Sequence, residues 1–161
     1  NVVTVNMGEP KFDWKDIPLA SQQNTQKVLL DEFEAFCLSM GNPHAVIFMQ
    51  NLDELESLNL NVVGPRLEKN INFPEFTNIE FACVLEDKTI RMRVWERGVG
   101  VTMACGSGAC ATLVAAFKIN KSSKSNKIIL DGGSLFVEWL NNGNVTLSGD
   151  TEKVYEGLIG G

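Results

Sequence analysis

The apolar residues of the chain gather in short, β-branched runs that are separated by Gly, Pro, Asn or Asp. Runs of this kind are typical of β-strands. They predict strands over residues 2–5, 25–30, 34–39, 45–49, 78–85, 89–95, 127–130, 135–140 and 145–148. The run 45–49 is unbroken, which predicts a strand buried on both faces. Asn142-Gly143 between the last two runs is a strong hairpin signal.

Two segments follow a helical pattern instead. Residues 53–58 carry acidic side chains in their first turn, where the helix dipole favours negative charge. Residues 108–119 are rich in alanine and end near Lys118, and they are apolar on almost every side, which predicts an enclosed helix. The pattern as a whole predicts an α+β fold, a mostly antiparallel sheet wrapped around a central buried helix.

Composition narrows the function classes. The chain has 161 residues, 44% of them hydrophobic, which suits a single domain with a real core. Its net charge of −6 argues against nucleic acid or an anionic membrane as partner. We see no signal peptide, and the uncharged stretch 98–117 fits a glycine-rich loop and buried helix better than a membrane span.

Cysteine and histidine content limits the chemistry further. Four cysteines make a thin disulfide framework for this length, so we expect free thiols in a reducing compartment, the cytoplasm. A single histidine, His44, excludes metal sites that need two, and we expect no metal.

The main candidate for a catalytic segment is Ala104–Cys110, where Cys105 lies between a loop and the first turn of the predicted buried helix. The first helical amides, freed by Gly106 and Gly108, form a nest for a carboxylate. The same partial positive charge is expected to lower the pKa of the Cys105 thiol. Such a thiolate could remove a proton from the carbon that bears the carboxylate. The segment alone is equally compatible with a small buried cysteine beside a turn, and Cys110 is expected in the core.

Two further pairs are candidates for binding. Glu96 and Arg97 end a predicted strand, where they could hold an ammonium and a carboxylate, although a surface ion pair is the commoner fate of such neighbours. Asn42 and His44 flank a breaker before a buried strand and could line a cleft. For His44 alone, a hydrogen-bonded core histidine is the better interpretation.

These residues carry a family resemblance. Residues 41–46, then Phe73-Pro74-Glu75 with Asn78, then 94–100, then 104–111 follow the order and spacing of diaminopimelate epimerases. The resemblance extends over essentially the whole chain, from Val5 to Gly157.

The resemblance implies an enzyme that interconverts LL- and meso-diaminopimelate, in lysine and cell-wall precursor synthesis, without pyridoxal phosphate or another cofactor. The family is built from two similar α/β halves, each with one catalytic cysteine, and the active site lies between them. Several positions of this chain match functional positions of the family. Cys105 matches the cysteine of the C-terminal half, and Gly106 and Ser107 match the backbone cradle for the reacting carboxylate. The residues that hold the distal end of the substrate match Asn42, Asn78, Glu96 and Arg97, and the positions that tune the cysteine pKa values match His44 and Glu96.

Two departures from the family pattern stand out. Val101 replaces the usual Glu, which puts local hydrogen bonding there in doubt. No second Cys-Gly-Asn-Gly-type motif is present, and stereoinversion needs an acid and a base on opposite faces of the α-carbon. We therefore expect residues 1–161 to be a single domain, the C-terminal half of a two-domain enzyme, inactive without its N-terminal domain. Residues 1–6 and 153–161 are candidate inter-domain strands, and a homodimer is one option for assembly.

Other functions remain open at this stage. The nearest is a related epimerase of another amino acid that also works without pyridoxal phosphate. A cysteine hydrolase with Cys105 as nucleophile and His44 as base leaves Asn42, Asn78 and the Glu96–Arg97 pair without a role. A non-catalytic module that binds amino-acid carboxylates is the third alternative.

Overall fold

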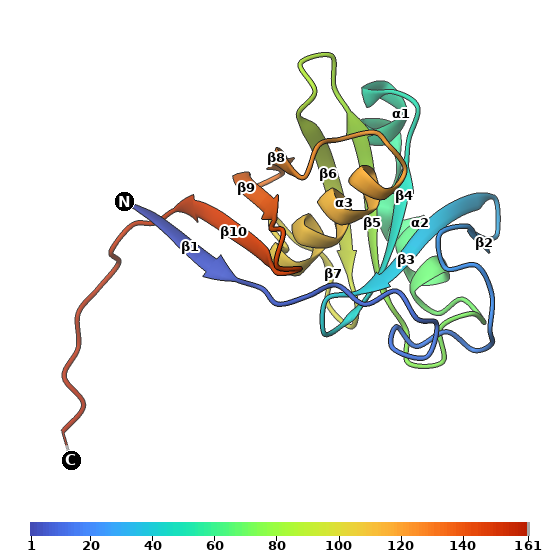
Figure 1. The fold of residues 1–161 in the computed structure, drawn as a ribbon, viewed down its shortest axis with the longest axis horizontal. Helices are drawn as coiled ribbons and strands as arrows, with labels where there is room; N and C mark the ends of the chain where they lie inside the picture. The colour runs from blue at the N-terminus through green and yellow to red at the C-terminus, as the bar shows by residue number, and fades with distance from the viewer. Residues whose placement is uncertain (161) are drawn as a thin grey trace.

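A computed structural model describes residues 1–160, which form a ten-stranded sheet and three helices (Figure 1). The strands are β1 (Val2–Asn6), β2 (Val28–Leu30), β3 (Phe33–Ser39), β4 (Pro43–Phe48), β5 (Asn78–Val84), β6 (Ile90–Glu96), β7 (Gly100–Val101), β8 (Ser125–Leu130), β9 (Gly133–Trp139) and β10 (Val145–Asp150). The helices are α1 (Leu52–Ser57), α2 (Leu60–Glu68) and α3 (Gly106–Lys118). Across the sheet the order is β1-β10-β9-β8-β6-β5-β4-β3-β2, and β7 pairs with β6 outside this path.

The expected fold class is wrong. The sheet is mixed, because β4 pairs with β5 and β6 pairs with β8 in parallel. Residues 49–77, which contain α1 and α2, connect the first of these pairs, and residues 97–124, which contain α3, connect the second. Crossovers of this length allow parallel pairing, whereas the strand pattern alone predicted a mostly antiparallel sheet. The sheet has ten strands and the helices are short, so the fold is not a mostly antiparallel sheet wrapped around a central helix.

The central strands separate two apolar clusters, one on each face of the sheet. The first cluster holds most of α3 together with Val46, Met92 and Val137. The second holds residues of α1, α2 and the N-terminal loop, with Ile47 and Phe81 from the strands. Because side chains alternate along a strand, neighbours such as Val46 and Ile47 belong to opposite clusters. Both faces of β4 and β5 are therefore covered, and the two strands are almost fully buried.

Most elements lie where the pattern predicts them, within a few residues at each end. The hairpin between β9 and β10 is confirmed, with Gly143 at a φ of 95°, a conformation that favours glycine. Helix α2 is absent from the prediction because Gly64 and Pro65 interrupt its pattern. A Cβ atom at Gly64 would lie 2.3 Å from the Trp95 ring, so glycine lets the helix approach β6 closely.

Other global features concern membranes and thiols. No helix within residues 1–160 is long and apolar enough to cross a membrane. All four cysteines are free thiols. Among the described residues, no three His, Cys, Asp or Glu side chains gather in a way that could hold a metal ion.

Candidate functional site

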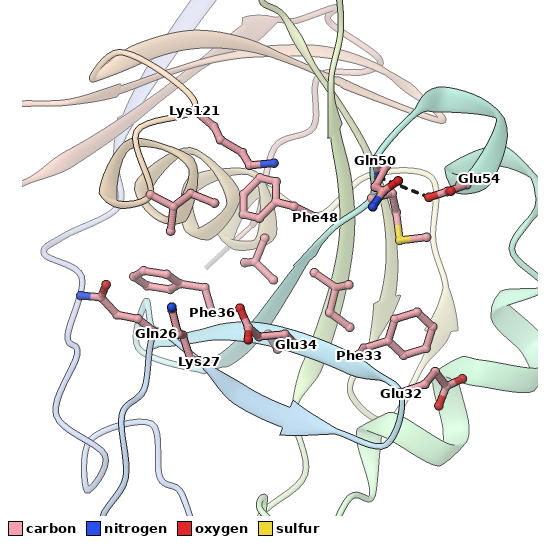
Figure 2. A pocket seen from close by; sticks show the side chains of 15 residues that line it. Gln26, Lys27, Glu32, Phe33, Glu34, Phe36, Phe48, Gln50, Glu54 and Lys121 are labelled. Carbon is pink, nitrogen blue, oxygen red and sulfur yellow. Dashed lines mark hydrogen bonds between the residues drawn. The ribbon is translucent and has the colours of Figure 1, made fainter.

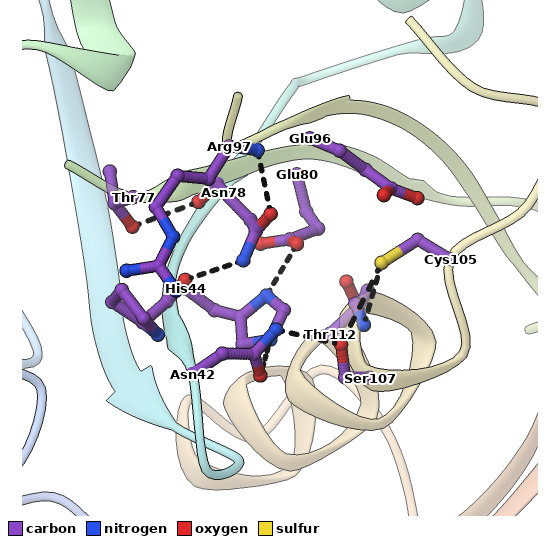
Figure 3. Close-up of polar contacts among 12 residues, drawn as sticks. Asn42, His44, Thr77, Asn78, Glu80, Glu96, Arg97, Cys105, Ser107 and Thr112 are labelled. Carbon is purple, nitrogen blue, oxygen red and sulfur yellow. Dashed lines mark hydrogen bonds and ion pairs between the residues drawn. The ribbon is translucent and has the colours of Figure 1, made fainter. Parts of the chain in front are cut away.

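The predicted site residues converge on one edge of the sheet. β4 and β5 are parallel, so both begin at this edge, and β6 runs antiparallel to β5, so it ends there. The register places His44 opposite Asn78, and Ile79 opposite Trp95. The N-terminus of α3 reaches the same edge, which brings Cys105 and Ser107 beside the strand ends (Figure 3).

Cys105 is the N-cap residue of α3. Its extended backbone (φ −142°, ψ 106°) lets Sγ turn back over the first helical turn, where it accepts a hydrogen bond from the Gly108 amide at 3.4 Å. Ser107 Oγ lies 3.7 Å from Sγ. A side chain at position 108 would clash, because its Cβ would lie 3.1 Å from Cys105 Sγ and 2.8 Å from Glu80 Oε1.

Asn78 ties three strand ends together. Its Oδ1 accepts a hydrogen bond from the Arg97 backbone amide at 2.8 Å, and its Nδ2 donates to the Pro43 carbonyl at 2.9 Å. Because the Asn78 side chain is buried, these bonds hold the start of β5 and the residue after β6 in fixed positions.

Glu96 and Arg97 do not bond to each other. Among the ion pairs of residues 1–160, none joins these two side chains. Instead, Glu96 Oε1 accepts a hydrogen bond from Thr102 Oγ1 at 2.8 Å, and Arg97 Nη1 donates one to the Glu75 carbonyl at 3.2 Å. Arg97 is exposed. The interpretation as a mutual surface ion pair is therefore wrong, and both charged groups are available at the rim of the site.

His44 is fully buried and bonded through both ring nitrogens. Nδ1 lies 2.6 Å from Glu80 Oε1, and Nε2 lies 2.9 Å from Asn42 Oδ1. Asn42 Nδ2 in turn donates to Ser107 Oγ at 3.3 Å. A continuous series of polar contacts thus runs from Glu80 through His44 and Asn42 to the helix that carries Cys105 (Figure 3).

Comparison with known proteins identifies the family. Residues 36–154 match the family model for diaminopimelate epimerase. This chain belongs to the diaminopimelate epimerase family. It is 46% identical over 160 residues to the diaminopimelate epimerase of Rhodospirillum centenum, which covers 98% of this chain and 54% of that protein. It is 43% identical to the enzyme of Acetivibrio thermocellus, covering 98% and 58%. The chain spans about half the length of the curated relatives it matches.

Solved structures share the fold of this chain. A probable proline racemase from Agrobacterium radiobacter superposes with a TM-score of 0.60 at 14% identity, covering 91% of this chain and 50% of that one. A predicted epimerase from Pseudomonas aeruginosa superposes with a TM-score of 0.59 at 15% identity, covering 92% and 55%. At this identity the likeness concerns the fold alone.

The electrostatics of this epimerase-family site differ from the expectation for Cys105. Burial and the nearby Glu80 carboxylate raise the pKa of the Cys105 thiol to about 12, with a further contribution from Glu96. The hydrogen bonds from Gly108 and Ser107 act in the opposite direction but are outweighed. The expected lowering by the helix terminus is therefore wrong for this chain, because the thiol is only 9% exposed and faces two carboxylates.

Sequence reasoning missed Glu80 and Thr102. Glu80 sits inside the predicted strand 78–85, which is buried in the structure, and a charged residue in an apolar run is itself a signal of a paired or functional group. Thr102 lies in the loop before Cys105 and carried no pattern. The sequence-based site also does not coincide with a cavity of about 610 Å³ beside β3, β4 and the end of α3, lined by Phe36, Phe48 and Lys121 among others (Figure 2).

Proposed function

We propose that this chain is the C-terminal half of a diaminopimelate epimerase, which interconverts LL- and meso-diaminopimelate without pyridoxal phosphate. One cysteine removes the α-proton of the substrate, and a second cysteine donates a proton to the opposite face of the same carbon. The observation that carries the proposal is the position of Cys105 at the N-terminus of α3, beside Asn42, Asn78, Glu96 and Arg97 on one sheet edge. The family membership and the identity to curated diaminopimelate epimerases support it.

Cys105 supplies one proton-transfer group. In a two-base inversion, one thiolate removes the α-proton while a thiol on the other face of the α-carbon donates its own. The raised pKa of Cys105 favours the thiol, so Cys105 acts as the donor when the second cysteine acts as the base. In the reverse direction the Cys105 thiolate left by that donation removes the proton, and the two cysteines exchange roles.

The surroundings of Cys105 suit an amino-acid substrate. The first amides of an α-helix have no acceptor within the helix, so those of Gly106 and Ser107 are available to the carboxylate on the reacting carbon. At the rim, the Arg97 guanidinium can take the distal carboxylate as a two-point fork, and Glu96 the distal ammonium. Asn42 and Asn78 are proposed to line this distal site, and Asn78 also fixes the Arg97 backbone.

One half of the cleft cannot present both proton-transfer groups. Cys37 and Cys83 belong to the apolar cluster on the opposite face of the sheet, and Cys110 is buried inside α3. Val99 and Met103 expose most of their apolar side chains beside the site. A second domain that carries the other cysteine would cover these residues and exclude water from the substrate.

The chain ends are the proposed connections to that domain. β1 is exposed along its whole length and pairs with β10, and the tail from residue 151 to 160 runs away from the body of the molecule (Figure 1). Residues 1–6 and 153–161 are therefore proposed to contribute to the inter-domain contact; residue 161 lies outside the described residues. A role in lysine and cell-wall precursor synthesis in the cytoplasm, and assembly as a homodimer, belong to the same proposal.

In the cysteine-hydrolase alternative, His44 would have to act as the base for Cys105, and its hydrogen bonds do not allow this. Both ring nitrogens of His44 are occupied by Glu80 and Asn42, so neither is directed to Cys105 Sγ. A Cys–His pair needs a direct hydrogen bond between sulfur and imidazole.

The test is turnover of LL-diaminopimelate, followed by chiral chromatography. The purified chain alone should show no inversion, and mixing it with a separately produced N-terminal half should restore it. Cys105→Ser in the mixture should abolish inversion, because a hydroxyl is far less acidic than a thiol, whereas Cys83→Ser on the opposite face serves as the control. Turnover by the chain alone, or full turnover with Cys105→Ser, would contradict the proposal.

A further inference from the structure

Glu80 is a buried acid that the proposed mechanism does not use. It lies in the middle of β5, paired with Val46 on one side and Val94 on the other, and its exposed fraction is 0%. Its side chain points toward the α3 face of the sheet, where most neighbours are apolar. A lone carboxylate in such a place is strongly disfavoured unless it is neutralised.

The polar contacts around His44 set the number of protons that it shares with Glu80. Asn42 uses its amide nitrogen on Ser107 Oγ, so it presents its carbonyl oxygen to His44 Nε2. A carbonyl oxygen only accepts, and Nε2 must therefore carry a hydrogen. Nδ1 lies 2.6 Å from a carboxylate oxygen of Glu80, which requires a hydrogen between them as well.

Charge balance favours the same arrangement. If the Asn42 amide were turned round, Nε2 would accept a hydrogen bond and the ring would stay neutral. The Glu80 carboxylate would then keep a full negative charge at 0% exposure, and its Oε2 has no hydrogen-bond partner among the described residues. A doubly protonated ring cancels that charge at the shortest contact in the site.

We propose that Glu80 is a positioning residue that holds His44 with hydrogen on both ring nitrogens, and that this cationic ring fixes the Asn42 carbonyl toward itself and the Asn42 amide toward Ser107. Because a ring with two N–H groups can only donate, the Asn42 amide cannot reverse without losing its bond to His44. Its amide nitrogen therefore stays directed at Ser107, two residues after Cys105. The benefit for catalysis rests on the proposed function; the proton arrangement itself does not.

Gly108 makes this arrangement possible. A Cβ atom there would lie 2.8 Å from Glu80 Oε1, so any larger residue would push the carboxylate away from the ring. The glycine thus lets the acid pass beneath the first turn of α3 to reach His44.

The experiment is nitrogen-15 NMR on the chain alone, in which His44 is the single histidine and its ring signals need no separation from others. At pH 7 we expect two directly bonded ring N–H signals, and contacts between the Asn42 side-chain amide and Ser107. In Glu80→Gln the ring should keep one N–H, because an uncompensated cation at that depth is disfavoured, and the contacts to Ser107 should weaken.

The matched control is Glu68→Gln. Glu68 is also buried, but it bonds Trp95 Nε1 and the Gly98 amide away from His44, so its loss should leave both ring N–H signals in place. A single N–H in the unsubstituted chain would overturn the proposal, as would two N–H signals that persist in Glu80→Gln. The spectrum of the unsubstituted chain decides the proton count even if Glu80→Gln does not fold. Its outcome is also independent of whether the assembled halves epimerise diaminopimelate.

Discussion

At the scale of single residues, burial and the carboxylates of Glu80 and Glu96 raise the pKa of Cys105. Cys105 and the Glu96–Arg97 pair follow a local motif, and the structure places them at one edge. Burial contributes most to the rise in pKa, followed by Glu80, which lies 25 positions earlier in the chain and reaches the sulfur because its side chain lies against Gly108 in the first turn of α3. Sequence neighbours cannot predict that contact.

The pKa of Cys105 predicts how its alkylation depends on pH. Because the thiolate is the nucleophile and the pKa is about 12, the rate with iodoacetamide should rise about tenfold per pH unit from pH 8 to 10 without a plateau. An ordinary thiol, with a pKa of about 8.5, approaches its plateau within that range. Mass spectrometry of the modified peptide follows the rate in the folded chain, with the urea-unfolded chain as control. A plateau below pH 9 in the folded chain would contradict the raised pKa.

Arg97→Lys in the assembled enzyme should raise the KM for diaminopimelate by about tenfold and change kcat less. A lysine replaces a two-point fork on the distal carboxylate by a point charge, which weakens binding in ground state and transition state alike. Steady-state kinetics measure both constants. Arg66→Lys is the matched control, since Arg66 pairs with Asp31 and Glu32 away from the site and should leave KM unchanged. An unaltered KM in Arg97→Lys would place Arg97 outside the substrate site.

At the scale of elements, hydrophobic pattern located the strands well but could not set their pairing direction. β9 and β10 were predicted as neighbours because Asn142-Gly143 specifies a tight local turn. β4 and β5 are parallel because the crossover of residues 49–77, which contains α1 and α2, returns the chain to the end of the sheet where β4 begins. α2 escaped prediction because its Gly64 and Pro65 normally interrupt helices. The reason for that glycine is a tertiary contact with Trp95, which no local pattern contains.

Gly64→Ala should therefore destabilise the chain. At an exposed helical position, the same change instead stabilises a protein by roughly 1 kcal/mol. The new Cβ would lie within 2.3–2.6 Å of three atoms of the Trp95 ring, whose Nε1 is held by Glu68. We expect the free energy of unfolding to fall by about 1–3 kcal/mol, as for other overpacked cores. Urea denaturation measures it, and Val62→Ala, at an exposed position of α2, should change stability by less than about 0.5 kcal/mol. Greater stability in Gly64→Ala would show that α2 does not pack closely on β6.

At the scale of the whole molecule, the core is covered on both faces of the sheet, whereas apolar side chains are exposed beside the proposed site. Both faces of the central strands are covered by apolar clusters, so the chain has what it needs to fold by itself. The proposed site lies at an edge beside exposed apolar residues, among them Val99 and Met103, and the C-terminal tail holds Leu158 and Ile159 fully in solvent. A folded scaffold with exposed apolar surface at its site and tail is what a separated half of a two-domain enzyme is expected to have.

Hydrogen exchange tests whether the C-terminal tail and the loop 97–104 contact an N-terminal domain. In the chain alone, amides of residues 152–160 should exchange within seconds, because the tail forms no helix or strand, while those of β4 and β5 should exchange slowly. On mixing with the N-terminal half, the tail and the loop 97–104 should gain protection of at least tenfold, since both would enter the interface. β4 and β5 serve as internal controls, because they are buried in either state and should not change. Strong protection of the tail in the chain alone, or none after the halves restore activity, would show that the tail does not join the two domains.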